Sequence, residues 1–229
     1  MQFAQLLGRV LLYIIGGLAY IISTAIIVGI AISAKVVAVE IGDRLLYSII
    51  VFGDLLRGIE IVELFNIVVF ALVGMGFGLA AGFLPSNIGR KLSAAFLIVV
   101  VPIIFMTTQL VRYDIWLNEV ANNENIPLER AATIANDFLE NRVGQDGIIG
   151  FYVYTGQFPI LPTKKTQMKQ LNSLEKNANS KFVQVTGIPP GIISFTMSLC
   201  FWSIRGFYFL VAAVTTIGHF REGIKIAKR

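Results

Sequence analysis

The sequence predicts an all-α polytopic membrane protein with four transmembrane helices, and two observations support that prediction. The chain has 229 residues, of which 55% are hydrophobic and only 14% charged, whereas a soluble domain typically has about 25% charged residues. Charged residues are also absent from long blocks, namely 10–34, 64–89 and 92–111, and residues 182–220 contain only Arg205. Each block reaches the roughly 20 apolar residues that cross a bilayer as a helix, the form in which backbone groups bond to each other in lipid.

These blocks divide the chain into three parts. A membrane domain is expected over residues 1–111, an extracytoplasmic and mainly helical domain over 112–187, and a last span with a basic cytoplasmic tail over 188–229. Within the membrane domain the spans are expected at about 10–33, 64–84 and 92–111. The first apolar run is longer than the core of a cleaved signal peptide, so it is interpreted as an uncleaved first helix.

Residues 35–63 mix charged and apolar side chains. The longest charge-free stretch inside this segment, residues 45–53, is too short to cross a bilayer. Helices lying in the membrane interface with their charges toward water are therefore expected. The alternative is a shallow re-entrant or tilted crossing, which would give five spans.

The last apolar block permits two arrangements. A span over residues 191–218 places Arg205 near mid-membrane, where a charge costs several kcal/mol and usually marks a partner carboxylate, an ion path or a lipid headgroup. A span over residues 182–204 leaves Arg205 at the cytoplasmic surface among aromatic residues that favour membrane interfaces. Only the first arrangement assigns Arg205 a function.

Three glycines of the second span, Gly74, Gly78 and Gly82, are spaced by four and share one helix face. Such a face lets another helix approach the backbone closely. Ala25, Gly29 and Ser33 form a weaker version on the first span. Three uses are open: packing within one chain, a contact between subunits, or a glycine-lined permeation path.

The water-exposed region has its own helical signals. A helix is expected from Leu128, after Pro127, to Gly144, with Leu128, Ala131, Ala135, Phe138 and Leu139 on one face. Residues 150–155 indicate a short strand or extended arm, and residues 163–180 a polar helix. Residues 112–146 carry net −4 and residues 147–187 net +4, so the two halves either fold onto each other or face a charged partner.

The basic residues that end the chain, Arg221, Lys225, Lys228 and Arg229, suit the anionic headgroups of a cytoplasmic leaflet or serve only as a topology signal. With four spans, counting charges places both termini in the cytoplasm. The exposed region contains nine Asn residues and no N-x-[ST] site. This absence favours a bacterial inner membrane or an organellar membrane, such as the thylakoid, over a eukaryotic plasma membrane.

The sequence also limits the classes of function. The net charge of +5 comes mainly from residues next to the apolar blocks, so no nucleic-acid partner is expected. With one Cys, one His and none of the common catalytic motifs, neither an enzyme nor a metal or cofactor site is expected. The favoured function is a non-catalytic protein that binds lipids and organises other membrane proteins or copies of itself, as an accessory subunit, assembly factor or scaffold. The alternative is a small-solute or ion transporter or channel component that uses Arg205.

Overall fold

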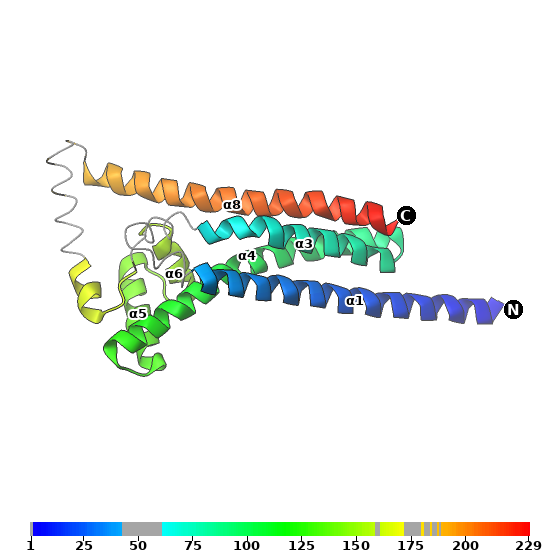
Figure 1. Ribbon diagram of the computed structural model, residues 1–229, viewed down its shortest axis with the longest axis horizontal. Coiled ribbons are helices and arrows are strands. Elements are labelled where there is room, and N and C mark those ends of the chain that lie inside the picture. Colours follow the sequence, from blue (N-terminus) through cyan, green and yellow to red (C-terminus); the bar gives the residue numbers. More distant parts are fainter. Residues whose placement is uncertain are drawn as a thin grey trace. The chain divides into compact units, whose positions relative to one another are not determined.

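The computed structural model describes residues 2–42, 61–158, 161–171, 180, 184, 187 and 189–229, and this part of the chain is helical, with no strand. Its α-helices are α1 (Gln2–Ile41), α3 (Asn66–Ala80), α4 (Ser86–Glu124), α5 (Leu128–Val143), α6 (Gly147–Thr155) and α8 (Pro190–Ala227), drawn in Figure 1. Short 3₁₀ segments, η2 (Ile61–Phe65) and η3 (Ala81–Phe83), flank α3.

Four helical segments are long and apolar enough to cross a membrane: Val10–Ile41, Val62–Phe83, Ser86–Glu124 and Ser198–Ala227. The prediction of an all-α, multi-pass integral membrane protein is confirmed. The helices extend beyond the predicted spans, because charged residues at a membrane edge do not end a helix. Helix α1 continues past Ser33 to Ile41, and α4 begins at Ser86 and runs through Pro102 to Glu124.

The segment predicted to lie in the interface is described only at its two ends. Residues 35–41 continue α1 and residues 61–63 begin η2, so both ends are helical. Lys35 does not face water as an interfacial charge would, because its side chain is buried. The helices expected between residues 43 and 60 lie outside the described residues.

The last helix is longer than either span expected for the last apolar block. Helix α8 is continuous from Pro190 to Ala227. It therefore extends beyond both Ile204 and Gly218, where the two expected spans end. Pro190 opens the helix, where its missing N–H leaves no bond unmade, and Arg205 lies inside it.

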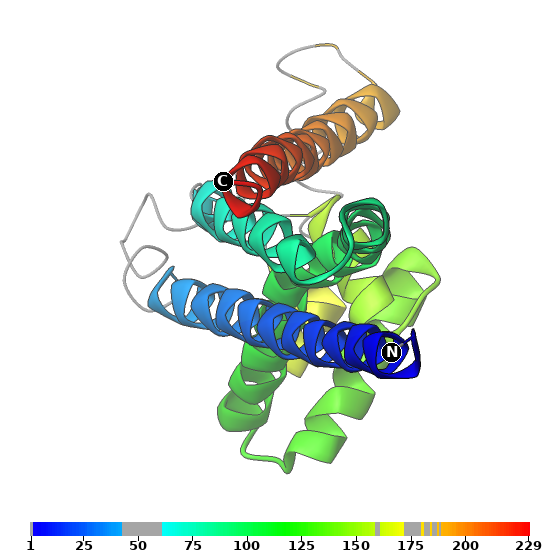
Figure 2. The same cartoon turned by 90° about the vertical axis from the view of Figure 1, so that its right-hand side faces the viewer.

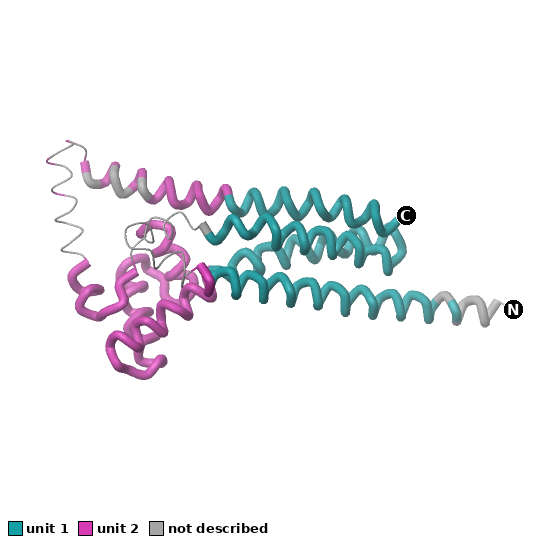
Figure 3. The backbone as a smooth tube through the Cα atoms, in the orientation of Figure 1, with its two compact units in different colours: residues 1–39, 62–108, 208–229 teal, residues 40–61, 109–207 magenta. Residues whose placement is uncertain are grey.

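The chain forms two compact units (Figure 3). Unit 1 contains residues 1–39, 62–108 and 208–229, and unit 2 contains residues 40–61 and 109–207. Helices α4 and α8 contribute residues to both units. The predicted extracytoplasmic domain falls inside unit 2, which also includes the first half of α8.

Unit 1 is a bundle built around α3. Seen along the helices, α3 has α1 on one side and α8 on the other (Figure 2). In the most apolar stretch of Val62–Phe83, 50% of the residues are buried inside the protein, against only 6% in that of Val10–Ile41. Helix α3 is therefore the centre of the bundle, and α1 is its most exposed member.

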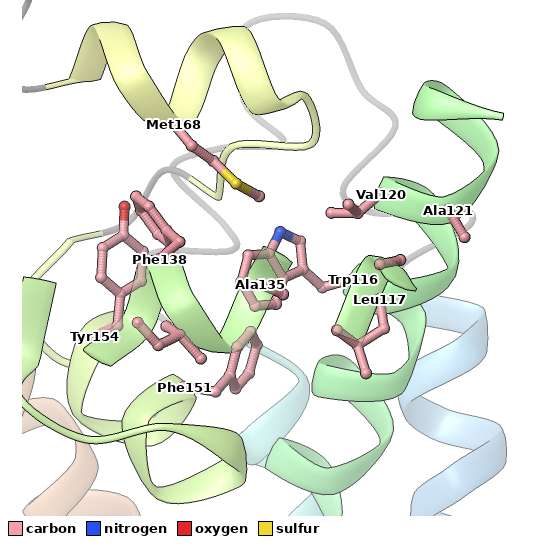
Figure 4. Close-up of a cluster of buried hydrophobic side chains, with 11 residues drawn as sticks. Trp116, Leu117, Val120, Ala121, Ala135, Phe138, Phe151, Tyr154 and Met168 are labelled. Atoms are coloured by element: carbon pink, nitrogen blue, oxygen red, sulfur yellow. The ribbon is translucent and has the colours of Figure 1, made fainter. Parts of the chain in front are cut away.

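Unit 2 contains an aromatic core formed by α4, α5, α6 and the helical turn at residues 165–171 (Figure 4). Trp116 is buried at its centre and donates a hydrogen bond from Nε1 to the Pro162 carbonyl at 2.8 Å. The two oppositely charged halves of the region meet here. Met168 packs in the same core as Phe138, and the backbone N–H of Lys165 donates to a Glu124 carboxylate oxygen at 2.8 Å.

Helix α5 follows the predicted pattern. It begins at Leu128 and ends at Gly144, which adopts a left-handed conformation with φ +72°. Of the five residues predicted to share an apolar face, four are buried, whereas Leu128 at the first turn is exposed. The first turn of α5 therefore extends beyond the core, and the rest of this helix face packs against that core.

The strand expected at residues 150–155 is wrong, because these residues belong to α6. Their aromatic and β-branched composition favours a strand only weakly, and tertiary packing overrides such a preference. In the helix, Phe151 and Tyr154 lie on one face and both enter the core. Gly150 permits this arrangement, because a Cβ there would collide with the Gln145 carbonyl.

Candidate functional site

The most heavily buried charges of unit 1 form one cluster, which we call the Lys35 cluster: Lys35, Glu63, Asn66, Phe70 and Phe105. Lys35 Nζ lies 3.3 Å from Glu63 Oε2 and donates to the Phe105 carbonyl at 3.2 Å. The ammonium also lies 5.9 Å and 5.3 Å from the ring centroids of Phe70 and Phe105. A carboxylate, a carbonyl and two aromatic faces thus surround one cation.

The spacing of these residues along their helices directs their side chains into the bundle. On α1 the buried residues Ala31, Lys35 and Val39 are four apart, so Lys35 lies on the only face that this end of α1 turns to the bundle. Glu63 and Asn66 stand three apart and share the buried face that continues along α3. The exposed fractions of Lys35, Glu63 and Asn66 are 3%, 2% and 0%.

Two oxygens of the cluster have no hydrogen-bond donor in the part of the chain that the structure describes. Asn66 Nδ2 donates to Glu63 Oε2 at 2.5 Å, which fixes the amide and aims its oxygen away from that contact. Glu63 Oε1 and Asn66 Oδ1 are buried and accept no hydrogen bond from any described residue. A buried acceptor left unsatisfied costs about 1–3 kcal/mol, so the cluster holds spare capacity for a donor or a cation.

Sequence reasoning missed this cluster because it assigned Lys35 and Glu63 to an interfacial segment. The periodicity contained a usable signal. Glu63 and Asn66 precede Phe70, Gly74 and Phe77 at helical spacing, so the acid shares the face of the predicted glycine groove.

The predicted glycine groove is occupied within the chain by α8, in a contact that we call the glycine seam: Gly74, Gly78 and Gly82 against Thr216, Gly223 and Ala227. A Cβ on Gly78 would lie 2.5 Å from the Phe220 carbonyl oxygen and 2.8 Å from Gly223 Cα. A Cβ on Gly223 would lie 2.9 Å from Gly78 Cα. The two helices therefore meet backbone to backbone. The i, i+4 pair Gly223 and Ala227 is the sequence signal that could have located the partner face.

The second predicted small-residue face, which we call the α1 stripe, is Ala25, Gly29 and Ser33. All three residues are exposed. A Cβ built on Gly29 would meet nothing within 4 Å. Unlike the glycine seam, the α1 stripe has no neighbouring helix in the described chain.

Arg205 is buried in unit 2 with an exposed fraction of 3%. Its guanidinium donates to the carbonyl oxygen of Tyr152, and its Nη2 donates to Thr155 Oγ1 at 2.8 Å. It also stacks 4.5 Å from the Tyr152 ring centroid and 5.7 Å from that of Trp202. These contacts fasten α6 to α8 and supply the guanidinium with hydrogen-bond acceptors and aromatic faces.

The predicted lipid-contacting residues Arg221, Lys225, Lys228 and Arg229 are all exposed at the end of α8. Lys228 and Arg90, from the first turns of α4, both line a hollow of about 150 Å³ in unit 1. Arg90 lies in helical backbone near the start of α4. Among the described residues, no three His, Cys, Asp or Glu side chains are grouped to hold a metal ion.

Replacing Gly78 by isoleucine should destabilise the bundle and lower the amount of protein in the membrane. The new side chain would enter a contact between two backbones, and overpacking of this kind typically costs about 1–3 kcal/mol. Gly218→Ile is the matched control, since Gly218 is exposed on α8 and a Cβ there meets nothing within 4 Å. For both variants, the amount of protein in the membrane and the thermal unfolding midpoint in detergent should be measured. Equal values for the two variants would contradict the glycine seam.

Replacing Arg205 by leucine should lower the thermal midpoint of the purified chain. It removes hydrogen bonds from a charged donor, each typically contributing about 1.5–3 kcal/mol. Arg205→Lys should lie between leucine and the native residue, because lysine keeps the charge and loses the planar fork that stacks on Tyr152. Arg221→Leu, at an exposed position, should change nothing. An unaltered midpoint in Arg205→Leu would show that the guanidinium does not hold α6 to α8.

Comparison with known proteins gives no relative from which a role for these residues can be transferred. No protein-family model, no curated protein and no solved structure matches the chain. What the Lys35 cluster, the glycine seam and the α1 stripe do must therefore be inferred from their own contacts, burial and charge.

Proposed function

We propose that this chain is a non-catalytic membrane protein that binds or organises other membrane proteins, as an accessory subunit, an assembly factor or a scaffold. The open α1 stripe is the observation that carries the proposal. The stripe combines two properties: α1 is scarcely covered by its own chain, and its small residues have the spacing used for close helix contacts.

Exposure alone does not indicate a partner, since lipid covers an apolar helix face as well as protein does. Large apolar side chains are suited to lipid, and α1 presents them at Ile22, Ile26 and Ile30. Small residues are different, because they give up side-chain contact with lipid and gain only when another backbone approaches. The glycine seam illustrates that gain inside this chain, and the α1 stripe offers the same chemistry outward.

Unit 2 supports the same proposal from the aqueous side. Its core is built from packed aromatic rings, with Trp116 and Phe151 centroids 5.6 Å apart and Phe138 and Tyr154 centroids 5.2 Å apart. Its surface has a hollow of about 340 Å³ with three cations, Arg142, Lys165 and Lys169, and one acid, Asp137. A packed core beneath a charged concave surface suits recognition of a partner.

The alternative proposal is a transporter or channel component that uses Arg205. It is less well supported, because Arg205 is engaged by a carbonyl, a hydroxyl and two aromatic rings of its own unit. An arginine that guides a moving ion needs freedom to change partners. A flux in reconstituted vesicles that Arg205→Leu alters without changing the thermal midpoint would reverse this preference.

Replacing Gly29 by isoleucine should release the partner while leaving the chain folded. Purification in mild detergent followed by mass spectrometry should find membrane proteins, or further copies of this chain, with the native form. Gly29→Ile should lose them at unchanged abundance, because the added side chain meets nothing in its own chain and separates only an external helix. Gly218→Ile should retain them.

Two results would contradict the proposal. One is a native chain that runs as a monomer with no copurifying membrane protein, after chemical cross-linking in the membrane as well as after extraction. The other is a partner that stays bound equally well to Gly29→Ile, which would place the contact elsewhere on the chain.

We further propose that both termini are cytoplasmic and that the membrane is a bacterial inner or an organellar one. In a Cys200→Ser background, Lys228→Cys should react with an impermeant maleimide only from the cytoplasmic side, and Asn123→Cys only from the opposite side. An N-terminal tag should share the side of Lys228→Cys. A tag on the other side would indicate an odd number of crossings, including one within residues 43–60.

A further inference from the structure

We propose that unit 1 has a binding site for the phosphate of an anionic glycerophospholipid, at the hollow of about 150 Å³ that Arg90 and Lys228 line. We call it the Arg90 hollow. Its polar lining is Ser86, Arg90 and Lys228, and its apolar lining includes Leu84 and Ile224. The inference goes beyond the proposed function and depends neither on a partner protein nor on the α1 stripe.

The hollow lies where three apolar helical segments have their ends, at one end of the bundle (Figure 1). The first of these segments ends at Phe83, the next begins at Ser86, and the last ends at Ala227. Only Leu84 and Pro85 connect the first two, so the chain turns back at this membrane surface. Apolar spans end where hydrocarbon gives way to the headgroup layer. The position of the hollow along the helices therefore places it at the depth of lipid phosphates.

The charge of the hollow selects the kind of headgroup. Its lining contains two cations, Arg90 and Lys228, and no acidic residue. Both cations are exposed, and neither forms an ion pair with a described residue. A zwitterionic lipid would bring a further cation into a site with no carboxylate to receive it. A lipid whose headgroup carries only the charge of its phosphate would not, so the hollow favours phosphatidylglycerol over phosphatidylcholine.

The polar side chains of the hollow are donors of the kinds that bind phosphate. The planar guanidinium of arginine can donate two parallel hydrogen bonds to phosphate oxygens, and lysine adds a point charge. Ser86 supplies a hydroxyl donor and stands four residues before Arg90 on α4, so the two share a helix face. Lys228 enters the lining from the end of α8. A phosphate in the hollow would therefore contact two helices at once.

The apolar part of the lining distinguishes a lipid from a soluble phosphate. Leu84 and Ile224 line the hollow beside its cations. Close to these residues in the chain, Phe83 and Ile88 have exposed fractions of 52% and 58%. The hollow is large enough for a headgroup phosphate but not for acyl chains, which would lie outside it against such apolar side chains. A free phosphate ion gains nothing from that apolar surface.

The experiment measures lipid binding to the purified full chain in mild detergent at fixed ionic strength. Dioleoyl phosphatidylglycerol should raise the thermal midpoint, because a ligand that binds only the folded form stabilises it. Dioleoyl phosphatidylcholine has the same acyl chains and should give no comparable rise. Inorganic phosphate at the same concentration should give none either. Titrating each compound against the midpoint gives its apparent affinity.

Two variants and two matched controls locate the site. Arg90→Gln and Lys228→Gln should each weaken phosphatidylglycerol binding about tenfold, the factor expected for losing a hydrogen bond that involves a charged group. Lys91→Gln and Lys225→Gln are the controls, because each removes one exposed cation from the same helix without touching the lining of the hollow. They should keep the native affinity. All four positions are exposed, so none of these substitutions should prevent folding.

Equal affinities for phosphatidylglycerol and phosphatidylcholine would overturn the inference. Equal losses in all four variants would also overturn it, since they would indicate diffuse attraction to a basic surface. A rise with inorganic phosphate that matches the rise with lipid would assign the hollow to a soluble anion and refute a lipid site. A chain that binds phosphatidylglycerol as expected but copurifies with no membrane protein would contradict only the proposed function.

Discussion

The close approach of α3 and α8 is the constraint on which the bundle depends. Lipid tails are as apolar as the helices, so burial from lipid supplies little force, and helices associate in membranes through packing and polar contacts. Gly78 and Gly223 allow that packing by removing both side chains at the point of contact. The remaining bundle contacts of α3 follow from this placement, because it fixes which face is left for α1 and α4.

That remaining face explains the chemistry of the Lys35 cluster. Glu63 and Asn66 continue the buried side of α3 toward its N-terminal end, where α1 contributes Lys35 and α4 the Phe105 carbonyl. A carboxylate placed there needs a cation, and Lys35 is the residue of α1 that the spacing of Ala31 and Val39 turns inward. The ion pair thus determines the rotation of α1 about its axis. Removing one partner of such a pair costs about 3–5 kcal/mol, because the other charge stays buried.

Sequence reasoning predicted the elements whose signals are local. Long apolar blocks located the four spans, and Pro127 and Gly144 located α5. It failed where the decisive contact is distant along the chain. Residues 150–155 have the composition of a strand, and only the core formed with Trp116 and Phe138 makes them a helix. Lys35 and Glu63 are 28 residues apart, so their charges resemble an interfacial segment until the two spans are placed side by side. Charge and hydropathy give the composition of a segment, whereas its burial depends on its neighbours.

The rotation imposed on α1 has a consequence for its opposite face. With Ala31, Lys35 and Val39 fixed inward, the residues about half a turn away must point outward, and Gly29 and Ser33 are among them. A change in the Lys35 cluster would therefore act on the orientation of the α1 stripe through a rigid helix, without any intervening loop. Loss of the Lys35–Glu63 ion pair would relax that rotation and weaken a contact made through small residues, since such contacts tolerate little misalignment.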